Sequence, residues 1–127
     1  MEPRDETPPF GTYAPNAAQR WIIAAAHGSV LGRGFFRDAV AACLRALRGG
    51  PIDWRVGGAA FRLYGEGNGT DTALLLKRRF DPVEIDFLAA GIRDGVCDGV
   101  FVDIGANVGA YALLVAAAND WRCRVVA

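Results

Sequence analysis

The sequence predicts an α/β fold that begins with a helical and hairpin extension, and three observations lead to this prediction. Two β-prone runs, at 99–104 and 123–127, enclose an Ala- and Leu-rich stretch at 108–118 that is long enough for a helix. Two adjacent glycines, Gly57-Gly58, separate two further β-prone runs. An amphipathic pattern covers residues 35–48. Strand, helix and strand in succession indicate a βαβ unit with parallel strands.

The composition is that of a soluble globular domain with one core, because 52% of the 127 residues are hydrophobic and 22% are charged. Fourteen basic residues balance fourteen acidic ones, so binding to nucleic acid or to an anionic membrane would need a local patch. Cys43, Cys97 and Cys123 form no CxxC pair, which argues against a zinc site or a disulfide framework and favours a reducing cytoplasm. The apolar stretch at 21–31 is too short to span a bilayer.

Changes in composition divide the chain into three parts. The first ten residues hold three prolines and four charges, so we expect a flexible lead-in, with order beginning near Pro15. The three parts are a mainly helical extension at 1–50, a hairpin and helix at 51–98, and the incomplete start of an α/β domain at 99–127.

The helix expected over 35–48 is amphipathic and ends at the Gly-Gly-Pro sequence 49–51. Its polar face is mixed in charge, so we expect it to pack on a neighbouring core rather than on a membrane. Its apolar face consists of Phe36, Val40, Cys43, Leu44 and Leu47.

Residues 52–64 are expected to form a β-hairpin that turns at Gly57 and Gly58, followed by a loop at 65–70. Residues 71–80 are expected to be either helix or strand, because their apolar periodicity fits both.

The next helix has a clearly marked start. Asp81 is expected to cap it, Pro82 suits the first helical position, and Glu84 lies three residues after the cap. Phe80 and Ile85 are expected to form a hydrophobic staple. An apolar stripe then runs to the end of the helix before Asp94 and Gly95, formed by Ile85, Leu88, Ala89 and Ile92.

The loop at 105–109 follows a strand expected to be buried on both faces and precedes a helix, a position where α/β folds bind ligands. The alanine and tyrosine after this loop are not the residues that a nucleoside triphosphate loop needs. A dinucleotide fingerprint matches at Gly105 and Ala110, but Asn107 replaces its second glycine and would crowd a diphosphate. A ligand with a carboxylate for the helix N-terminus and a cation for Asp103 fits better.

The stretch "FVDIGANVGAYALLVA" resembles the first motif of S-adenosylmethionine-dependent methyltransferases, in the DxGANxG form of the FkbM family. Asp103, Gly105, Ala106, Asn107 and Gly109 are the matching positions. The resemblance extends upstream through "FRLYGEGNGTDTALLLKRRFDPVEIDFL" and covers roughly the last three fifths of the chain, from residue 51, whereas the first fifty residues have only a weak likeness.

This resemblance implies a Rossmann-like domain that transfers a methyl group from S-adenosylmethionine to a hydroxyl of a small molecule, sugar or lipid. It implies that Gly105 and Gly109 allow close backbone approach, that Asn107 tolerates an unusual loop conformation, and that Asp103 helps to hold the methionyl amine. An NAD(P)-dependent oxidoreductase, which Asn107 disfavours, and a non-catalytic, truncated ligand-binding protein remain the alternatives.

In the family, an acidic residue after the second strand binds the ribose hydroxyls, and here it would lie beyond Ala127. We therefore expect the chain to be the N-terminal part of a longer protein, truncated after its first βαβ unit and inactive alone. The catalytic residues stay unassigned for the same reason. Of the remaining polar residues, we expect His27 to have a packing or surface role and "KRR" at 77–79 to be a solvated face, with contact to an anionic substrate as its alternative.

Overall fold

The computed structural model describes residues 7–65, 68–95 and 99–127 and combines helices with two small sheets, in agreement with the predicted α/β class. Cys97 and two residues of the predicted loop 65–70 lie outside the described residues. The elements are α1 (Ala17–Ala26), η1 (Val30–Gly32), α2 (Gly34–Leu47), β1 (Ile52–Val56), β2 (Ala59–Leu63), α3 (Gly69–Leu76), α4 (Pro82–Arg93), β3 (Val100–Val102), α5 (Ala110–Ala118) and β4 (Arg124–Val126).

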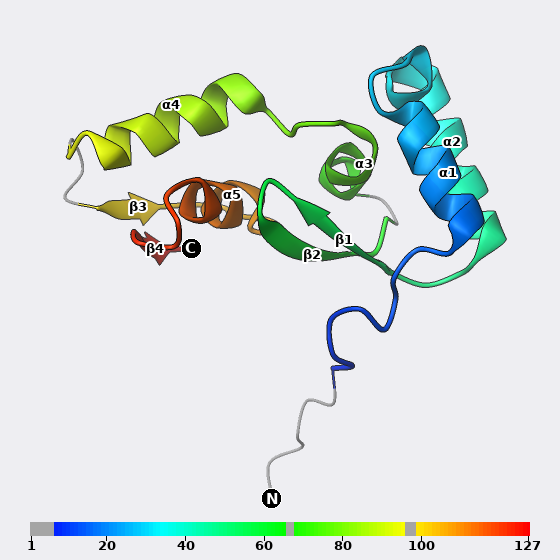
Figure 1. Cartoon of the computed structure of the whole chain (residues 1–127), viewed down its shortest axis with the longest axis horizontal. Helices are drawn as coiled ribbons and strands as arrows, with labels where there is room; N and C mark the ends of the chain where they lie inside the picture. The colour runs from blue at the N-terminus through cyan, green and yellow to red at the C-terminus, as the bar shows by residue number, and fades with distance from the viewer. Residues whose placement is uncertain (1–6, 66–67, 96–98) are drawn as a thin grey trace, which may run out of the picture.

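The molecule is elongated, with α1 and α2 side by side at one end and β3, β4, α4 and α5 at the other (Figure 1). The β1–β2 hairpin and α3 lie between these two ends and join them. One hydrophobic core runs through both ends of the molecule, from Ile23 in α1 to Val115 in α5. In the described parts of the chain, no helix has the length and apolar character needed to cross a bilayer.

The N-terminus of α1 is fixed by a capping box. The Asn16 side chain accepts the Gln19 N–H at 2.9 Å, and the Gln19 side chain accepts the Asn16 N–H at 3.0 Å. Gln19 is fully buried, and its Nε2 donates to the carbonyl of Leu44 in α2 at 3.2 Å. A polar residue therefore ties the two helices together without leaving a buried amide unpaired.

The helix predicted over 35–48 is present as α2, but its buried face differs from the prediction. Ala41 and Leu44 are buried, whereas Phe36, Cys43 and Leu47 are exposed. A helix that packs on one side buries only one face, and in α2 this face contains Ala41 and Leu44, so the larger apolar residues lie toward solvent.

The predicted hairpin is confirmed. β1 and β2 pair antiparallel, with Ile52 opposite Leu63 and Val56 opposite Ala59. Gly57 and Gly58 form the turn with φ angles of +53° and +85°, the left-handed conformation that such a turn requires.

The ambiguous segment 71–80 is helical over its first half, as part of α3. Every residue from Asp71 to Leu76 is buried, between α2 on one side and the hairpin on the other. A helix that is covered on all sides has no polar face, so its sequence shows no period that would distinguish it from a buried strand.

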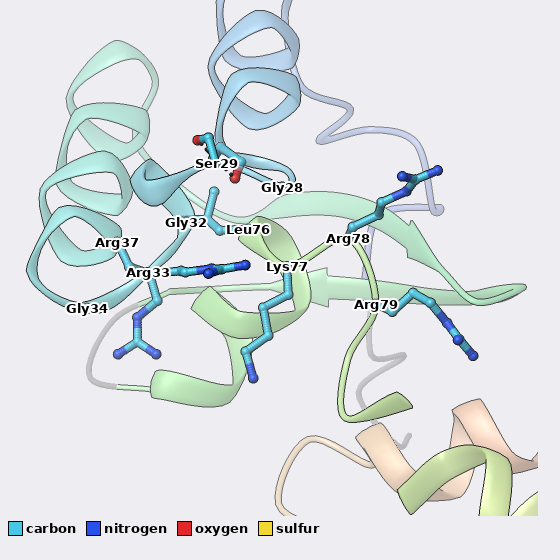
Figure 2. Close-up of a pocket in the computed structure, with 11 residues that line it drawn as sticks. Gly28, Ser29, Gly32, Arg33, Gly34, Arg37, Leu76, Lys77, Arg78 and Arg79 are labelled. Carbon is cyan, nitrogen blue, oxygen red and sulfur yellow. Dashed lines mark hydrogen bonds between the residues drawn. The ribbon is translucent and has the colours of Figure 1, made fainter. Parts of the chain in front are cut away.

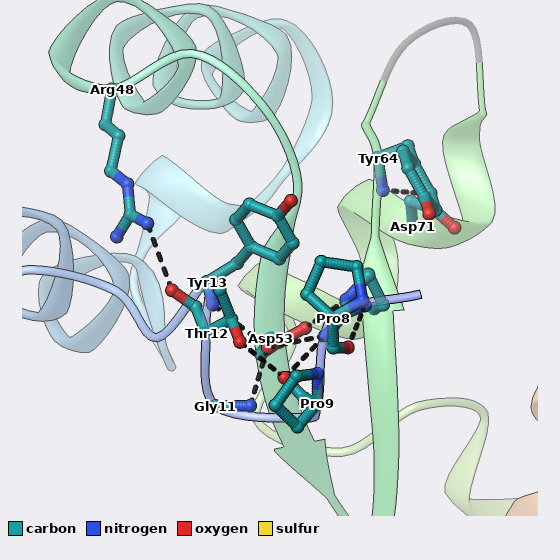
Figure 3. A network of polar contacts seen from close by, with 10 residues as sticks. Pro8, Pro9, Gly11, Thr12, Tyr13, Arg48, Asp53, Tyr64 and Asp71 are labelled. Atoms are coloured by element: carbon teal, nitrogen blue, oxygen red, sulfur yellow. Dashed lines mark hydrogen bonds and ion pairs between the residues drawn. The ribbon is translucent and has the colours of Figure 1, made fainter. Parts of the chain in front are cut away.

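Residues 8–13, which include the end of the expected flexible lead-in at 1–10, are instead held against the hairpin by Asp53 of β1 (Figure 3). The Asp53 carboxylate accepts the N–H groups of Gly11 and Tyr13 at 2.7 and 3.1 Å and pairs with Arg62 at 2.7 Å. Arg62 in turn donates to the carbonyls of Pro8 and Pro9 at 2.8 and 3.0 Å. Ordered structure was expected to begin near Pro15 but begins earlier, because a buried carboxylate needs hydrogen bonds from nearby donors.

The start of α4 is where predicted, but the capping prediction for Asp81 is wrong. Asp81 has a left-handed conformation with φ of +35° and makes no side-chain bond to the helix N-terminus. Its carboxylate instead accepts Lys77 Nζ at 3.3 Å and Tyr111 Oη at 3.0 Å. The two residues of the predicted staple, Phe80 and Ile85, are both buried.

The predicted strand–helix–strand unit is present, since β3 and β4 pair in parallel on either side of α5 in the chain. Burial of the first strand on both faces is not observed. Phe101 packs against the core, whereas Val102 is 56% and the following Ile104 is 92% exposed. Side chains alternate between the faces of a strand, and in this two-stranded sheet only one face of β3 meets the core.

Candidate cofactor site

Asp103 lies at the end of β3 and links this strand to the first turn of α5. Its N–H donates to the carbonyl of Val126 at 2.7 Å, which extends the parallel pairing by one residue. Its half-buried carboxylate accepts the N–H of Ala112 through Oδ2 at 3.1 Å. Within the described residues no donor contacts Oδ1. The carboxylate is therefore fixed by one oxygen and can accept a cationic group with the other.

The loop after Asp103 contains three residues in the left-handed conformation. Gly105, Asn107 and Gly109 have φ angles of +77°, +53° and +72°. Glycine adopts this conformation freely and asparagine tolerates it better than most residues do, so the residue types match the backbone. A bond of 2.8 Å from the Gly109 N–H to the Ala106 carbonyl closes the loop before α5. The glycines are thus required by the path of the chain, whether or not a ligand is bound.

The loop leaves space beside its first glycine. A Cβ placed on Gly105 would meet no heavy atom within 4 Å, and the residue is exposed. The N-terminus of α5 begins at the other end of the loop, with Gly109 as its N-cap. Among the described contacts, the N–H groups of Ala110 and Tyr111 have no acceptor. A helix N-terminus with unpaired N–H groups attracts anions.

Asn107 joins this loop to the start of α3. Its Oδ1 accepts Asn68 Nδ2 and its Nδ2 donates to Thr70 Oγ1, both at 3.4 Å. Asn68 also caps α3 by accepting the Thr70 N–H at 3.0 Å. The N-termini of α3 and α5 therefore lie on either side of Asn107, and both place partial positive charge near the loop.

No site role was predicted from the sequence for Asn68 or Thr70. Asn68 precedes an apolar run and has the residue type of an N-cap, which was an available local signal. Nothing in the sequence pairs it with Asn107, because the two residues are 39 positions apart.

Tyr111 connects the start of α5 to the start of α4. Its hydroxyl donates to Asp81 at 3.0 Å, and its ring packs edge-on against Phe80 with 5.8 Å between the ring centroids. Burial raises the pKa of Tyr111, and the hydrogen bond to the Asp81 carboxylate raises it further. The neutral phenol is therefore the form that the fold stabilises.

Replacing Tyr111 with phenylalanine is expected to lower the free energy of unfolding by about 1 kcal/mol, through loss of the bond to Asp81. Because the folded pKa is raised, the stabilisation from Tyr111 is fully present below pH 10.0 and is lost as pH rises through that folded pKa. Urea unfolding at neutral and alkaline pH measures both effects. Tyr64→Phe is the control, since Tyr64 is 61% exposed, and an equal loss in this variant would contradict the assignment.

The five residues predicted for the site all lie in or beside one exposed loop between β3 and α5. Comparison of the chain with protein-family models, with curated proteins and with solved structures gave no match. The geometry therefore carries the functional argument. It offers one half-buried carboxylate, two unpaired N–H groups and an open glycine within a few residues of one another. The predicted site residues are Asp103, Gly105, Ala106, Asn107 and Gly109.

Proposed function

We propose that this chain binds S-adenosylmethionine through the loop 103–109 and forms the cofactor-binding part of a Rossmann-like methyltransferase. The observation that carries the proposal is the carboxylate of Asp103, which is held by Ala112 through one oxygen and lies at the strand end that leads into α5. Ligands of open α/β sheets bind at this end of the strands.

The charges of the methionyl group match those of the loop. Its ammonium would pair with Oδ1 of Asp103, and its carboxylate would accept the N–H groups of Ala110 and Tyr111 at the α5 N-terminus. The exposed backbone at Gly105 leaves room for the ligand. When bound, the sulfonium would supply an electrophilic methyl group, and the loop would hold the donor in a fixed orientation.

The acceptor is proposed to be a hydroxyl of a small molecule, sugar or lipid, as the resemblance to the FkbM family implies. Among the described residues we assign no catalytic base. The proposed role of this loop is therefore to bind and orient the cofactor.

Isothermal titration calorimetry of the complete gene product with S-adenosylhomocysteine tests the proposal. Asp103→Asn is expected to weaken binding by about tenfold or more, because a charged hydrogen bond contributes roughly 1.5 to 3 kcal/mol. Asp120→Asn is the matched control, since Asp120 is exposed in the turn after α5 and asparagine tolerates its left-handed φ of +53°. Circular dichroism checks that both variants fold.

Three results would contradict the proposal in different ways. Binding of NADH without binding of S-adenosylhomocysteine would replace the methyltransferase with an oxidoreductase. Binding of S-adenosylhomocysteine without methylation of any hydroxylated small molecule, sugar or lipid would leave a non-catalytic binding protein. Equal losses of affinity in Asp103→Asn and Asp120→Asn would show that the loop is not the binding site.

A further inference from the structure

A pocket lies at the opposite end of α3 from the candidate cofactor loop. It has a volume of about 430 Å³ and is formed by the end of α1, the glycine-rich segment 28–34 and the residues that follow α3. Because α3 has eight residues, its two ends are about 12 Å apart. The pocket is therefore separate from the loop at Asn107, which contacts the N-terminus of α3.

Five cationic residues and no acidic ones line this pocket. They come from two segments about forty residues apart, and in Figure 2 the Arg33 side chain extends across toward the backbone at Lys77. The whole sequence has no net charge, so the cluster is a local concentration of positive charge. These residues are Arg33, Arg37, Lys77, Arg78 and Arg79.

Ion pairs with neighbouring acids leave much of this charge uncompensated. Arg37, Lys77 and Arg79 each have one carboxylate partner, at 3.3, 3.3 and 2.8 Å, and all three pairs are at least partly exposed to solvent. In the described part of the chain, Arg33 and Arg78 have no ion pair. Like charges held close together repel one another, and a bound anion would relieve this repulsion.

The position of Arg33 and Arg37 is unfavourable without an anion. Arg33 is the N-cap of α2 and supplies no side-chain cap, and the first turn of this helix holds no acid. Helix N-termini carry partial positive charge and favour anions, so two arginines here oppose the helix dipole. The N–H groups of residues 34–36 have no acceptor among the described contacts. The same anion could therefore interact with the arginines and with these N–H groups.

Packing holds the two cationic segments together. Gly32 lies so close to the carbonyl oxygens of Ala26 and Leu76 that a Cβ there would be 2.7 and 2.9 Å from them. His27 adds a bond of 3.0 Å from Nε2 to the Leu75 carbonyl. The segment before α2 is thus fixed against the end of α3, so the backbones of the two cationic segments are held side by side.

We propose that this pocket binds a phosphate monoester through Arg33, Arg37 and Lys77. Guanidinium groups bind phosphate oxygens in a bidentate manner, and the ammonium adds a mobile point charge. The site is independent of the proposed methyltransferase function, because it lies at the other end of α3.

Calorimetry with inorganic phosphate and with glycerol 3-phosphate, in chloride buffer, tests the site in the complete gene product. The double variant Arg33→Gln/Arg37→Gln is expected to bind both at least tenfold more weakly. Lys77→Gln provides a second variant on the other segment and is expected to weaken binding several-fold. The matched control is Arg122→Gln/Arg124→Gln, which removes the same charge from exposed positions outside the pocket and is expected to retain binding.

Vesicles of phosphatidylcholine with phosphatidic acid distinguish a lipid headgroup from a soluble ligand. Binding to these vesicles that Arg33→Gln/Arg37→Gln abolishes would identify the phosphate as that of a lipid, and binding to glycerol 3-phosphate alone would identify a soluble monoester. Equal losses in the pocket variant and the control would overturn the proposal, as would no binding of any phosphate at millimolar concentration. Binding of S-adenosylhomocysteine is a separate measurement, so failure of one proposal leaves the other testable.

Discussion

Replacing Asp53 with asparagine is expected to lower the free energy of unfolding by about 3 kcal/mol at neutral pH. The Asp53 side chain is 1% exposed and pairs with Arg62 at 2.7 Å. It also accepts the N–H groups of Gly11 and Tyr13. The neutral amide would leave the largely buried Arg62 cation without its counter-ion, and its NH₂ group would face other donors. Urea unfolding of the wild-type and variant proteins measures the loss.

The same contact makes the wild-type protein sensitive to acid. Arg62, and then the N–H groups of Tyr13 and Gly11, lower the pKa of Asp53 from 3.8 to about 2, against the opposing effect of burial. Because this pKa is lowered, the stabilisation from the ionised Asp53 is present above pH 3.8 and is lost as the pH falls toward 2. The shift corresponds to about 2 kcal/mol. We expect this acid-dependent loss in the wild-type protein and not in Asp53→Asn.

Asp86→Asn is the control for both measurements. Asp86 pairs with Arg79 at 2.8 Å, but the two side chains are 59% and 62% exposed. Exposed pairs contribute little because water and salt screen them, so this variant is expected to unfold at nearly the wild-type urea concentration. Equal effects of the two substitutions would contradict the role given to Asp53.

Replacing Gly32 with alanine is expected to lower the free energy of unfolding by about 2 to 3 kcal/mol. The new Cβ would be 2.7 Å from the Ala26 carbonyl oxygen and 2.9 Å from that of Leu76. Both are backbone atoms at the ends of helices, so neither can rotate away as a side chain would. The end of α1 or α3 would have to move. Thermal or urea unfolding measures the effect, and phosphate binding is expected to weaken with it because the same segment lines the pocket.

Gly91→Ala is the matched control for this substitution. Gly91 lies inside α4, and a Cβ there would meet no heavy atom within 4 Å. Alanine favours the helix over glycine by about 0.5 to 1 kcal/mol, so this variant is expected to be more stable than the wild-type protein. Unchanged stability of Gly32→Ala would show that the contact between the two helix ends tolerates an added methyl group.

Features set by neighbouring residues could be predicted from the sequence. The two glycines at 57–58 determine the hairpin turn because few other residues adopt positive φ angles. The β3–α5–β4 succession follows from apolar runs of suitable length, with glycines and an asparagine where the loop turns. The residues of the candidate cofactor loop were predictable for the same reason, because five residues within seven positions stay together in any fold.

Features set by distant residues could not be predicted in this way. Asp81 has the residue type and position of a cap, but in the folded chain its carboxylate accepts hydrogen bonds from Tyr111 and Lys77. No local pattern in the sequence singles out Asp53, yet Arg62 and the N-terminal segment bury it.

The sequence by itself determined the order of the helices and strands other than α1 and α3, together with the glycine loop after β3, because propensity, capping and turn chemistry act over a few residues. Tertiary structure alone decided that α3 is a buried helix and that Asn107 contacts its N-terminus. It also decided that Arg33 and Lys77 line one pocket at the other end of α3. The first outcome depends on contacts of α3 with α1, α2 and the hairpin, and the other two depend on residues about forty positions apart. Only close packing of the folded chain, as at Gly32, brings such residues together.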